Sequence, residues 1–368
     1  MAPIPREHRR LLASYRMPAE WEPHLATYLG WPHNLETWPG KFEVIPPVFA
    51  QMAAAIAAFE PVRILVNDAA QLASVRAMIR AAAGGDGIIA RRVDVFHVPT
   101  NDSWIRDYGP IFVNRVGTRG GGGAKQIALD FIFNSWGGKY AGGTYGSPEL
   151  DDVVPQRLGE RYGFEVVAPG IVLEGGSIDV NGTGTVLTTE SCLLNRNRNP
   201  KLSRAEIEDY LRAYLGVSTV LWLGDGIAGD DTDGHIDDLA RFVAPDTIVT
   251  MVENDRTDVN YAPLADNLKR LRAMRDAAGK PFRIETLPMP PALVHDGTRL
   301  PASYANFYLA NGGVVMPSFG CAADKAAAAT LARLFPGRRV VAIPSSDLVW
   351  GLGAIHCLTQ QHPMPPGR

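Results

Sequence analysis

Short apolar runs alternate with longer amphipathic stretches along most of this 368-residue chain. The short runs are typical of buried strands and the longer stretches of helices that cover a sheet, so their order indicates an α/β protein. We expect strands at 62–66, 111–113, 166–172, 186–188, 220–223, 248–252, 314–316 and 340–343. We expect helices at 48–59, 68–83, 203–215, 262–278 and 324–334. Asp68 and Ser203 are good N-caps, and Glu206 would complete a capping box with Ser203.

Five short polar segments interrupt this alternation, each with an acid, His, Asn or Cys beside a glycine or an aromatic residue. Their key residues are Asp107, Glu174, His235 with Asp237, Asn306, and Cys357. The steps between them are 67 (107 to 174), 61 (174 to 235), 69 (237 to 306) and 51 (306 to 357) residues. Similar steps suggest about five copies of one supersecondary unit, which would bring the segments together at a central axis. Coincidental spacing in an ordinary α/β protein is the alternative.

The composition narrows the classes of function. Hydrophobic residues make up 46% of the chain, and the charged residues are mixed in sign with a net charge of −3. Without a basic block, nucleic-acid binding has no electrostatic support. No run of about 18 apolar residues predicts a membrane span. Glycine and proline are spread along the chain rather than gathered in a linker, so we expect one domain over residues 1–368.

The cysteines and the N-terminus indicate a reducing compartment. The three cysteines, Cys192, Cys321 and Cys357, form no CxxC pair, which argues against a disulfide framework and a structural zinc site. The N-terminal segment lacks the apolar core of a signal peptide. We therefore expect a cytoplasmic protein, and a homodimer is the assembly that we consider.

Cys357 is the strongest candidate for a nucleophile. It follows Gly351, Gly353 and His356, and glycines allow a sharp backbone bend that leaves room for a ligand. A lone cysteine is more often a small core residue than a nucleophile, and we expect Cys192 and Cys321 to be core or partly exposed residues without a role in the chemistry.

Three carboxylates suggest what the thiol attacks. A Cys–His pair such as Cys357 and His235 forms a thiolate and moves protons afterwards. Asp107, Glu174 and Asp237 lie in glycine-flanked turns, and burying them requires strong partners. A guanidinium is such a partner, because its planar fork of N–H groups is held bidentately by carboxylates. Attack on its central carbon would expel ammonia without a metal or an organic cofactor, so we expect a small cationic guanidinium substrate.

Each of these residues also has an ordinary interpretation. Asp107 could pair with the adjacent Arg106, Glu174 could end a strand, and Trp104 could be a core aromatic. Two other classes of protein stay open, a cysteine hydrolase of acyl bonds and a binding module without catalysis. Two further motifs carry little weight. The GxGxxG pattern at 224–229 runs into an acidic stretch that would repel a phosphate, and no metal-ligand spacing accompanies His235.

Seven motifs resemble the agmatine deiminase family, which includes the porphyromonad-type peptidylarginine deiminases. The resemblance runs nearly end to end. Its motifs are RMPAEWEPH (16–24), NDSWIRDYGP (101–110), LEGGSI (173–178), LLNRNRNP (193–200), TDGHID (232–237), SYANFY (303–308) and IHCLTQQ (355–361).

The resemblance implies a pentein fold, which is a five-bladed α/β-propeller of ββαβ-type units around a central site. It implies that Cys357 is the nucleophile, His235 the general acid and base, and that Asp107 and Asp237 grip the guanidinium. It also implies that Glu174 orients His235 and the substrate.

For the substrate channel, the resemblance implies that Trp104 forms a wall. Asn306 would lie at the rim of the channel, and Gly353 beside the substrate.

Two positions depart from the family pattern. Ala354 stands where an asparagine is common, and Tyr108 where isoleucine is common. These changes leave the guanidine chemistry intact but leave the substrate tail open. Agmatine deiminase is the leading hypothesis and peptidylarginine deiminase the alternative. Glu22, Asp230 and Asp231 are candidates to bind the amine of agmatine.

Overall fold

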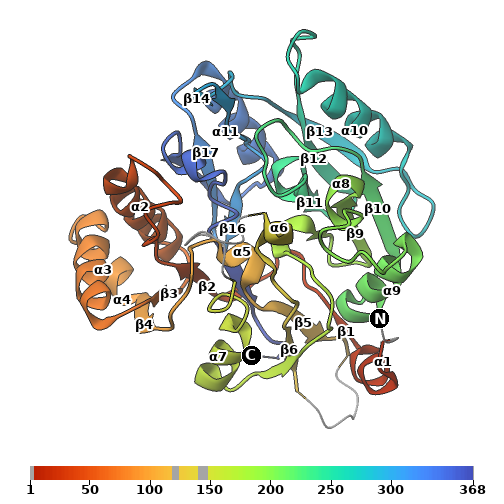
Figure 1. Cartoon of the computed structure of the whole chain (residues 1–368), viewed down its shortest axis with the longest axis horizontal. Helices are drawn as coiled ribbons and strands as arrows, with labels where there is room; N and C mark the ends of the chain where they lie inside the picture. The colour runs from red at the N-terminus through yellow and green to blue at the C-terminus, as the bar shows by residue number, and fades with distance from the viewer. Residues whose placement is uncertain (1–3, 118–123, 140–147, 368) are drawn as a thin grey trace.

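The computed structural model describes residues 4–117, 124–139 and 148–367. Helices and strands alternate along the chain, and the strands form several separate sheets. The predicted mixed α/β class is therefore confirmed. Figure 1 shows long helices such as α3 (Ala69–Ala82) and α10 (Tyr261–Ala273) at the periphery, whereas the short helix α5 (Ile105–Tyr108) lies near the centre.

Five sheets of three or four strands form from the described residues. The first contains β19 (Gln360–Pro363), β2 (His24–Gly30), β3 (Val62–Val66) and β4 (Val93–His97). The second contains β1 (Tyr15–Arg16), β5 (Ile111–Arg115), β6 (Gln126–Leu129) and β7 (Glu165–Val167). The third contains β10 (Thr219–Leu223), β9 (Thr185–Thr189) and β8 (Asp179–Val180). The fourth contains β11 (Ala240–Ala244), β12 (Thr247–Val252) and β13 (Arg283–Pro288), and the fifth β16 (Tyr308–Ala310), β17 (Gly313–Ser318) and β18 (Arg339–Pro344).

All five sheets contain the same unit, in which an antiparallel pair is followed by a helix and then by a parallel strand. The crossover helices are α2 (Ile45–Ala57), α7 (Val154–Tyr162), α9 (Arg204–Leu215), α10 and α11 (Ala322–Leu334). The remaining helices are α1 (Arg6–Leu12), α3, α4 (Gly87–Arg91), α5, α6 (Ser135–Gly138) and α8 (Glu190–Leu193). Short 3-10 turns are η1 (Phe42–Val44), η2 (Gly175–Ser177), η3 (Ile236–Asp238) and η4 (Leu348–Gly351), and β14 (Val294–His295) pairs with β15 (Thr298–Arg299).

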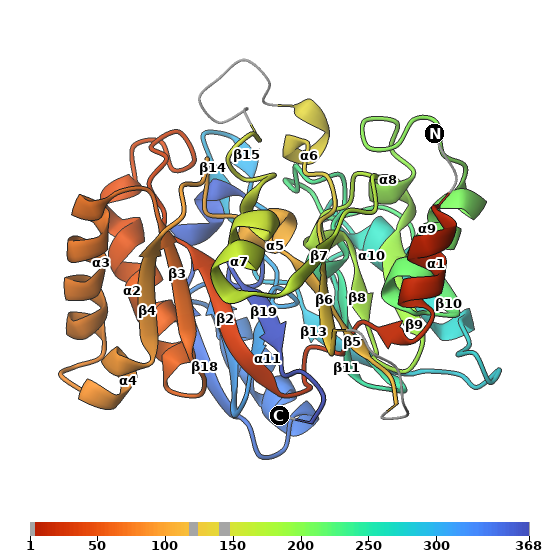
Figure 2. The same ribbon diagram turned by 90° about the horizontal axis from the view of Figure 1, so that it is seen from below.

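The first sheet joins the two ends of the chain. C-terminal strand β19 pairs antiparallel with β2, and Gln360 lies opposite Tyr28. The loop that carries Cys357 runs directly into β19, so this pairing sets the position of the thiol. Figure 2 shows β19 and β2 side by side beneath α5.

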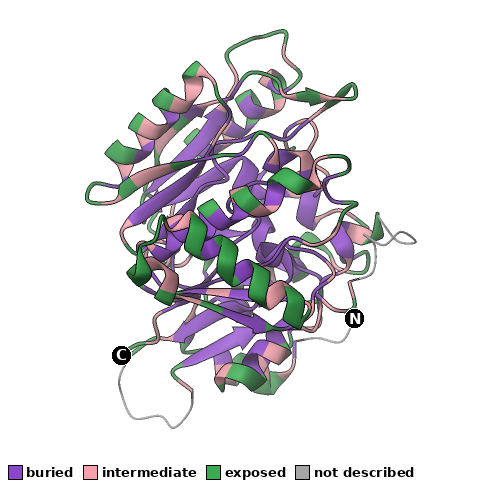
Figure 3. Ribbon diagram, turned by 90° about the vertical axis from the view of Figure 1, so that its left-hand side faces the viewer, coloured by how far each residue is buried: buried purple, intermediate pink, exposed green. Residues whose placement is uncertain are grey.

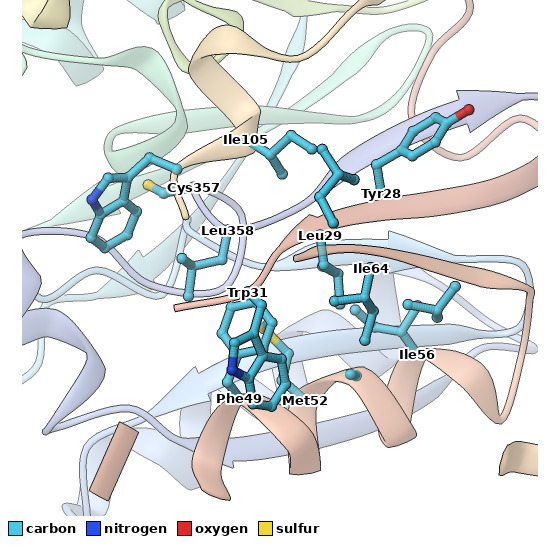
Figure 4. Packing of buried hydrophobic residues seen from close by; sticks show 14 of the residues in the cluster. Tyr28, Leu29, Trp31, Phe49, Met52, Ile56, Ile64, Ile105, Cys357 and Leu358 are labelled. Carbon is cyan, nitrogen blue, oxygen red and sulfur yellow. The ribbon is translucent and has the colours of Figure 1, made fainter. Parts of the chain in front are cut away.

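The core lies between the sheets and their covering helices. Figure 3 shows buried strands and exposed outer faces on the helices. One hydrophobic cluster extends from α2 and the first sheet to Trp104 and Cys357. In Figure 4, Cys357 and Leu358 lie at one end of this cluster, and Trp31 and Phe49 continue it toward α2. The residue that carries the thiol is therefore held by closely packed hydrophobic side chains.

Most of the predicted elements form, with shifted ends. The two predicted N-caps are confirmed, because Asp68 accepts from the backbone of Gln71 and Ser203 forms its capping box with Glu206. The strand predicted at 166–172 is wrong beyond Val167, because Pro169 lacks an N–H donor and Gly170 adopts a φ of +79°. The helix predicted at 262–278 ends at Ala273.

Candidate active site

The five polar segments predicted from the sequence lie in the five connections that lead from one sheet to the next. In chain order they carry Asp107 between β4 and β5, Glu174 between β7 and β8, His235 between β10 and β11, Asn306 between β15 and β16, and Cys357 between β18 and β19. Contacts between their side chains bring all five segments into one buried cluster.

The Cys357 thiol contacts two of the other segments. The side-chain amide of Asn306 donates to Sγ at 3.0 Å, and Oδ2 of Asp237 lies 3.8 Å from Sγ. Burial, reinforced by Asp237, Asp238 and Asp107, raises the pKa of the Cys357 thiol well above its usual value, and the Asn306 hydrogen bond only partly opposes this. The thiol is therefore protonated at neutral pH in the free protein.

Asp237 is held by the histidine next to the thiol. Its Oδ2 lies 2.7 Å from Nδ1 of His356, and Nε2 of His356 lies 2.8 Å from Oε2 of Glu20. Burial opposes ionisation of Asp237, but His356, His235 and Arg241 together hold its pKa below the usual value. Oδ1 of Asp237 has no hydrogen-bond partner in the described part of the chain. Asp237 thus offers one open, negatively charged oxygen to a ligand.

Asp107 lies across the cluster, and two donors orient it. The backbone N–H of Gly176 donates to Oδ1 at 3.0 Å, and the indole N–H of Trp136 donates to Oδ2 at 2.9 Å. Burial raises the pKa of Asp107 to about 6. The suggested pairing with Arg106 does not form, because that guanidinium donates to Gln361 and to the carbonyl of His356.

The side chain of His235 is fully buried, but its ring nitrogens are available to a substrate. Its Nδ1 lies 3.7 Å from Oδ1 of Asp107, and neither ring nitrogen has a partner at hydrogen-bonding geometry within the described residues. Burial lowers the pKa of His235, but Asp107, the nearby Cys192 thiol and Asp237 outweigh it and raise the pKa well above its usual value. This imidazole is therefore a proton donor at neutral pH.

Glu174 lies beside His235, and an arginine holds one of its carboxylate oxygens. Its Oε1 accepts from Nε of Arg198 at 2.7 Å, and Arg198 is in turn paired with Asp233. Oε2 of Glu174 has no hydrogen-bond partner among the described residues. One carboxylate oxygen of Glu174, the sulfur of Cys192 and a ring nitrogen of His235 all lie within 4.8 Å of one another.

Trp104 and two glycines form one wall of the site. Trp104 is buried, and its ring centroid lies 5.5 Å from that of Trp38, with the two ring planes tilted by 35°. A Cβ at Gly353 would lie 2.5 Å from the Trp104 ring and 3.1 Å from Cβ of Cys357, and a Cβ at Gly351 would lie 3.0 Å from the same ring. Only glycines therefore allow this loop to pass between the indole and the thiol.

Asn306 lies deeper than expected. The resemblance implied a position at the channel rim, but the side chain is fully buried against the sulfur. Its amide also donates to Asp238 at 3.0 Å, and its carbonyl accepts the backbone N–H of His356 at 2.8 Å. Asn306 thus fixes both the sulfur and the backbone that presents it.

Sequence reasoning missed several residues of the site. A Cβ at Gly176 would lie 2.5 Å from Nδ1 of His235, 2.9 Å from Asp107 and 3.1 Å from Asp237, so this glycine leaves the central space open. Its place directly after Glu174 and Gly175 was the available signal. Trp136 gave no signal, because its hydrogen bond to Asp107 joins positions 29 residues apart.

Two of the three candidates for binding a substrate tail are engaged elsewhere. Glu22 forms a two-point pair with Arg16 at 2.6 and 2.7 Å, and Asp230 accepts from the backbone N–H groups of Thr232 and His235. These two carboxylates shape neighbouring loops, and their binding of a substrate tail stays a prediction. The third candidate, Asp231, contacts Lys139 through its backbone carbonyl.

A cavity of about 470 Å³ lies beside Gly351 and Leu352. It is lined by Glu36, Thr37, Pro39, His295, Asp296, Thr298, Leu300, Trp350, Gly351 and Leu352. Since Gly351 also borders the Trp104 ring, the cavity adjoins the wall of the site. Two of its lining residues, Glu36 and Asp296, are acidic.

Across the described ranges, no helix is both long and apolar enough to cross a membrane.

Comparison with known proteins places the chain among guanidine-modifying enzymes. The family model of the Porphyromonas-type peptidyl-arginine deiminases matches residues 16–363. The agmatine deiminase of Ectopseudomonas mendocina is 39% identical over 372 residues, which cover 96% of this chain and 96% of that protein.

Solved structures give the same relationship. The agmatine deiminase of Enterococcus faecalis superposes with a TM-score of 0.88 at 33% identity, covering 99% of each chain. A variant of the agmatine deiminase of C. jejuni with substrate bound superposes with a TM-score of 0.82 at 30% identity, covering 95% of this chain and 97% of that chain.

Proposed function

The chain belongs to the Porphyromonas-type peptidyl-arginine deiminase family, and on that premise we propose that it hydrolyses agmatine to N-carbamoylputrescine and ammonia. The observation that carries the proposal is the single buried cluster of a thiol, an imidazole with open nitrogens and two aspartates that are ionised at neutral pH. Such a cluster is suited to a planar cation whose carbon is a poor electrophile.

Asp107 and Asp237 would hold the guanidinium from two sides. Asp237 is ionised and offers its open Oδ1 atom, while Asp107 ionises fully as the cation arrives. Two carboxylates that would repel each other when both charged are thereby matched by a permanent positive charge. Gly176 leaves between them the space that the guanidinium fills.

Binding of the cation also prepares Cys357. The same carboxylates that raise the thiol pKa are neutralised by the substrate, so the thiol loses its proton to solvent when agmatine binds. The thiolate attacks the guanidinium carbon, and the imidazolium of His235 gives its proton to one terminal nitrogen. The C–N bond then breaks, ammonia leaves, and an amidino-thioether remains on Cys357.

Water completes the cycle. Neutral His235 takes a proton from a water molecule, whose oxygen attacks the amidino carbon. The C–S bond breaks, the ureido product leaves, and the thiolate is restored. The second proton of water passes to the released ammonia, which departs as ammonium.

His235 fits the acid–base role better than the adjacent His356. Both nitrogens of His356 are occupied by carboxylates, whereas those of His235 have no hydrogen-bond partner in the described chain. Glu174 would orient His235 and accept from the substrate through its open Oε2 atom. Trp104 and Gly353 would keep the guanidinium plane aligned with the sulfur.

The cavity beside η4 supports agmatine over an arginine derivative. Agmatine ends in an ammonium, and the lining residues Glu36 and Asp296 suit that charge. No arginine or lysine that could bind a substrate carboxylate is among the described lining residues of this cavity. We therefore place the substrate tail in this cavity.

We also propose that the five ββαβ units surround a central axis as the blades of a propeller. Their shared connection pattern and the location of all five polar segments between sheets support this arrangement. Contacts between the segments of every connection support one domain over residues 1–368.

The direct test supplies purified protein with agmatine, free arginine and an arginyl peptide and measures ureido product and ammonia. The proposal predicts that agmatine gives the highest kcat/KM. Preference for the arginyl peptide would move the assignment to peptidylarginine deimination, and cleavage of an ester with an acyl adduct would replace it with acyl hydrolysis.

A further inference from the structure

One buried thiol beside the site takes no part in the bond-making and bond-breaking steps of the proposed reaction. Cys192, on α8, is fully buried, and its Sγ lies within 4.8 Å of ligand atoms on Glu174 and on His235. We propose that Glu174, Cys192 and His235 form an inhibitory binding site for a thiophilic divalent cation such as Zn²⁺. When occupied, the site would withdraw His235 from proton transfer.

The three side chains are a ligand set that zinc prefers. Thiolate, neutral imidazole and carboxylate are common zinc ligands, and a thiolate with a carboxylate cancels the double charge of the ion. Among the described residues, the two ring nitrogens of His235 and the Oε2 atom of Glu174 have no hydrogen-bond partner. A cation could therefore bind these atoms without displacing a hydrogen bond. Arg198 holds the other oxygen of Glu174 at 2.7 Å and thereby orients the carboxylate.

A second cluster is less suited to a cation. Asp237, Asp238 and Cys357 also have ligand atoms within 4.8 Å of one another. However, Oδ2 of Asp237 is bound by His356, and Asn306 donates both to Asp238 and to the sulfur of Cys357. A cation would have to displace these hydrogen bonds, and the set lacks a nitrogen ligand.

Binding at the first cluster has two costs. The Cys192 thiol and the His235 imidazolium must each release a proton to solvent, so the affinity should rise with pH. The positive charge of Arg198 is close, but its partner Asp233 offsets it. Zinc bonds of about 2.0–2.3 Å would also draw the three ligands together by small side-chain rotations.

Cobalt(II) provides a readout that does not depend on turnover, because thiolate ligation gives it a near-ultraviolet charge-transfer band. The chain has three cysteines, so the variant Cys321→Ala/Cys357→Ala keeps Cys192 as the sole thiol. We expect this double variant to develop the band at one equivalent of Co²⁺, and Zn²⁺ to displace it. Absence of the band in the double variant, or a band in wild type that disappears with Cys357→Ala alone, would overturn the proposal.

The effect on turnover rests on the proposed function and is measured separately. We expect Zn²⁺ to inhibit the wild-type protein and the control Cys321→Ser equally. Measured against its own metal-free rate, Cys192→Ser should require at least about 100-fold more Zn²⁺ for inhibition. Equal inhibition of Cys192→Ser and wild type would refute the inhibitory role. If no guanidine substrate is turned over at all, the proposed function fails, but the cobalt titration still decides the metal site.

Discussion

The Nδ1 atom of His356 lies 2.7 Å from Oδ2 of Asp237, so the histidine beside the nucleophile is bound to a carboxylate rather than to the sulfur. The opposite edge of its ring contacts Glu20 at 2.8 Å. Glu20 therefore acts on the site through His356, as a positioning residue that keeps Asp237 oriented and ionised.

Glu20→Gln tests this relay. Loss of the buried charge weakens the hold on His356, and we expect kcat/KM for agmatine to fall by about tenfold or more, mainly through KM. The matched control is Glu60→Gln, which alters a second buried Glu–His pair, Glu60 with His24 at 3.0 Å, away from the cluster. An equal loss of kcat/KM in both variants would show that the effect is merely structural.

Gly176→Ala tests whether the central space is needed. The added Cβ would lie 2.5 Å from Nδ1 of His235, so we expect turnover to fall by at least about 100-fold with little change in the circular dichroism spectrum. Gly87→Ala is the control, because its Cβ would make only ordinary contacts with Arg91. Normal kcat and KM for Gly176→Ala would show that the guanidinium does not bind at this position.

The raised pKa of Cys357 predicts slow alkylation of the free protein. Iodoacetamide reacts with the thiolate, so its rate at Cys357, followed by peptide mass, should be low at pH 7 and rise toward pH 9 and above. Cys321, which is only partly buried, provides an internal comparison. Fast alkylation of Cys357 at pH 6 without substrate would contradict ionisation driven by substrate.

The pKa of Asp107, raised to about 6, predicts an acid limb in the activity profile. Below this pH the carboxyl is protonated and loses its attraction for the guanidinium, so kcat/KM should decrease as the pH falls through about 6. A profile that stays flat down to pH 4.5 would contradict this role of Asp107.

The raised pKa of Asp107 also predicts that the ionised carboxyl, which favours substrate binding, destabilises the fold. A carboxyl whose pKa is higher in the folded state binds its proton more tightly there, so it destabilises the fold as the pH rises from about 4 to about 6. The melting temperature of Asp107→Asn relative to wild type should therefore increase between pH 5 and pH 7. A difference that stays constant would show that Asp107 titrates normally.

Much of the site could be predicted because its residues lie in short, distinctive motifs. Cys357, His235, Asp107, Asp237 and Glu174 converge as expected, since each lies in a connection between repeated units. Eight of the nineteen strands in the described residues followed from hydrophobic runs. The strands that were not predicted are β1, β2, β4, β6, β8, β11, β13, β14, β15, β16 and β19.

The rest depends on contacts that no local pattern encodes. Trp136 reaches Asp107 and Glu20 reaches His356 across distant parts of the chain, and the depth of Asn306 depends on how its loop packs against the sulfur. Glu22, Asp230 and Asp231 were candidates to bind the substrate tail, because a sequence shows charges but not the contacts that those charges already make.

The proposed reaction depends on a covalent adduct on Cys357, which the mass of the peptide that contains Cys357 reveals during turnover. Wild-type protein mixed with saturating agmatine is quenched in acid within the first turnovers, digested, and analysed by mass spectrometry, with Cys357→Ala as the control. We expect the peptide containing Cys357 to gain the mass of agmatine minus ammonia, and no peptide of the control to do so. Turnover of agmatine by Cys357→Ala, or an adduct on another residue in wild type, would contradict it.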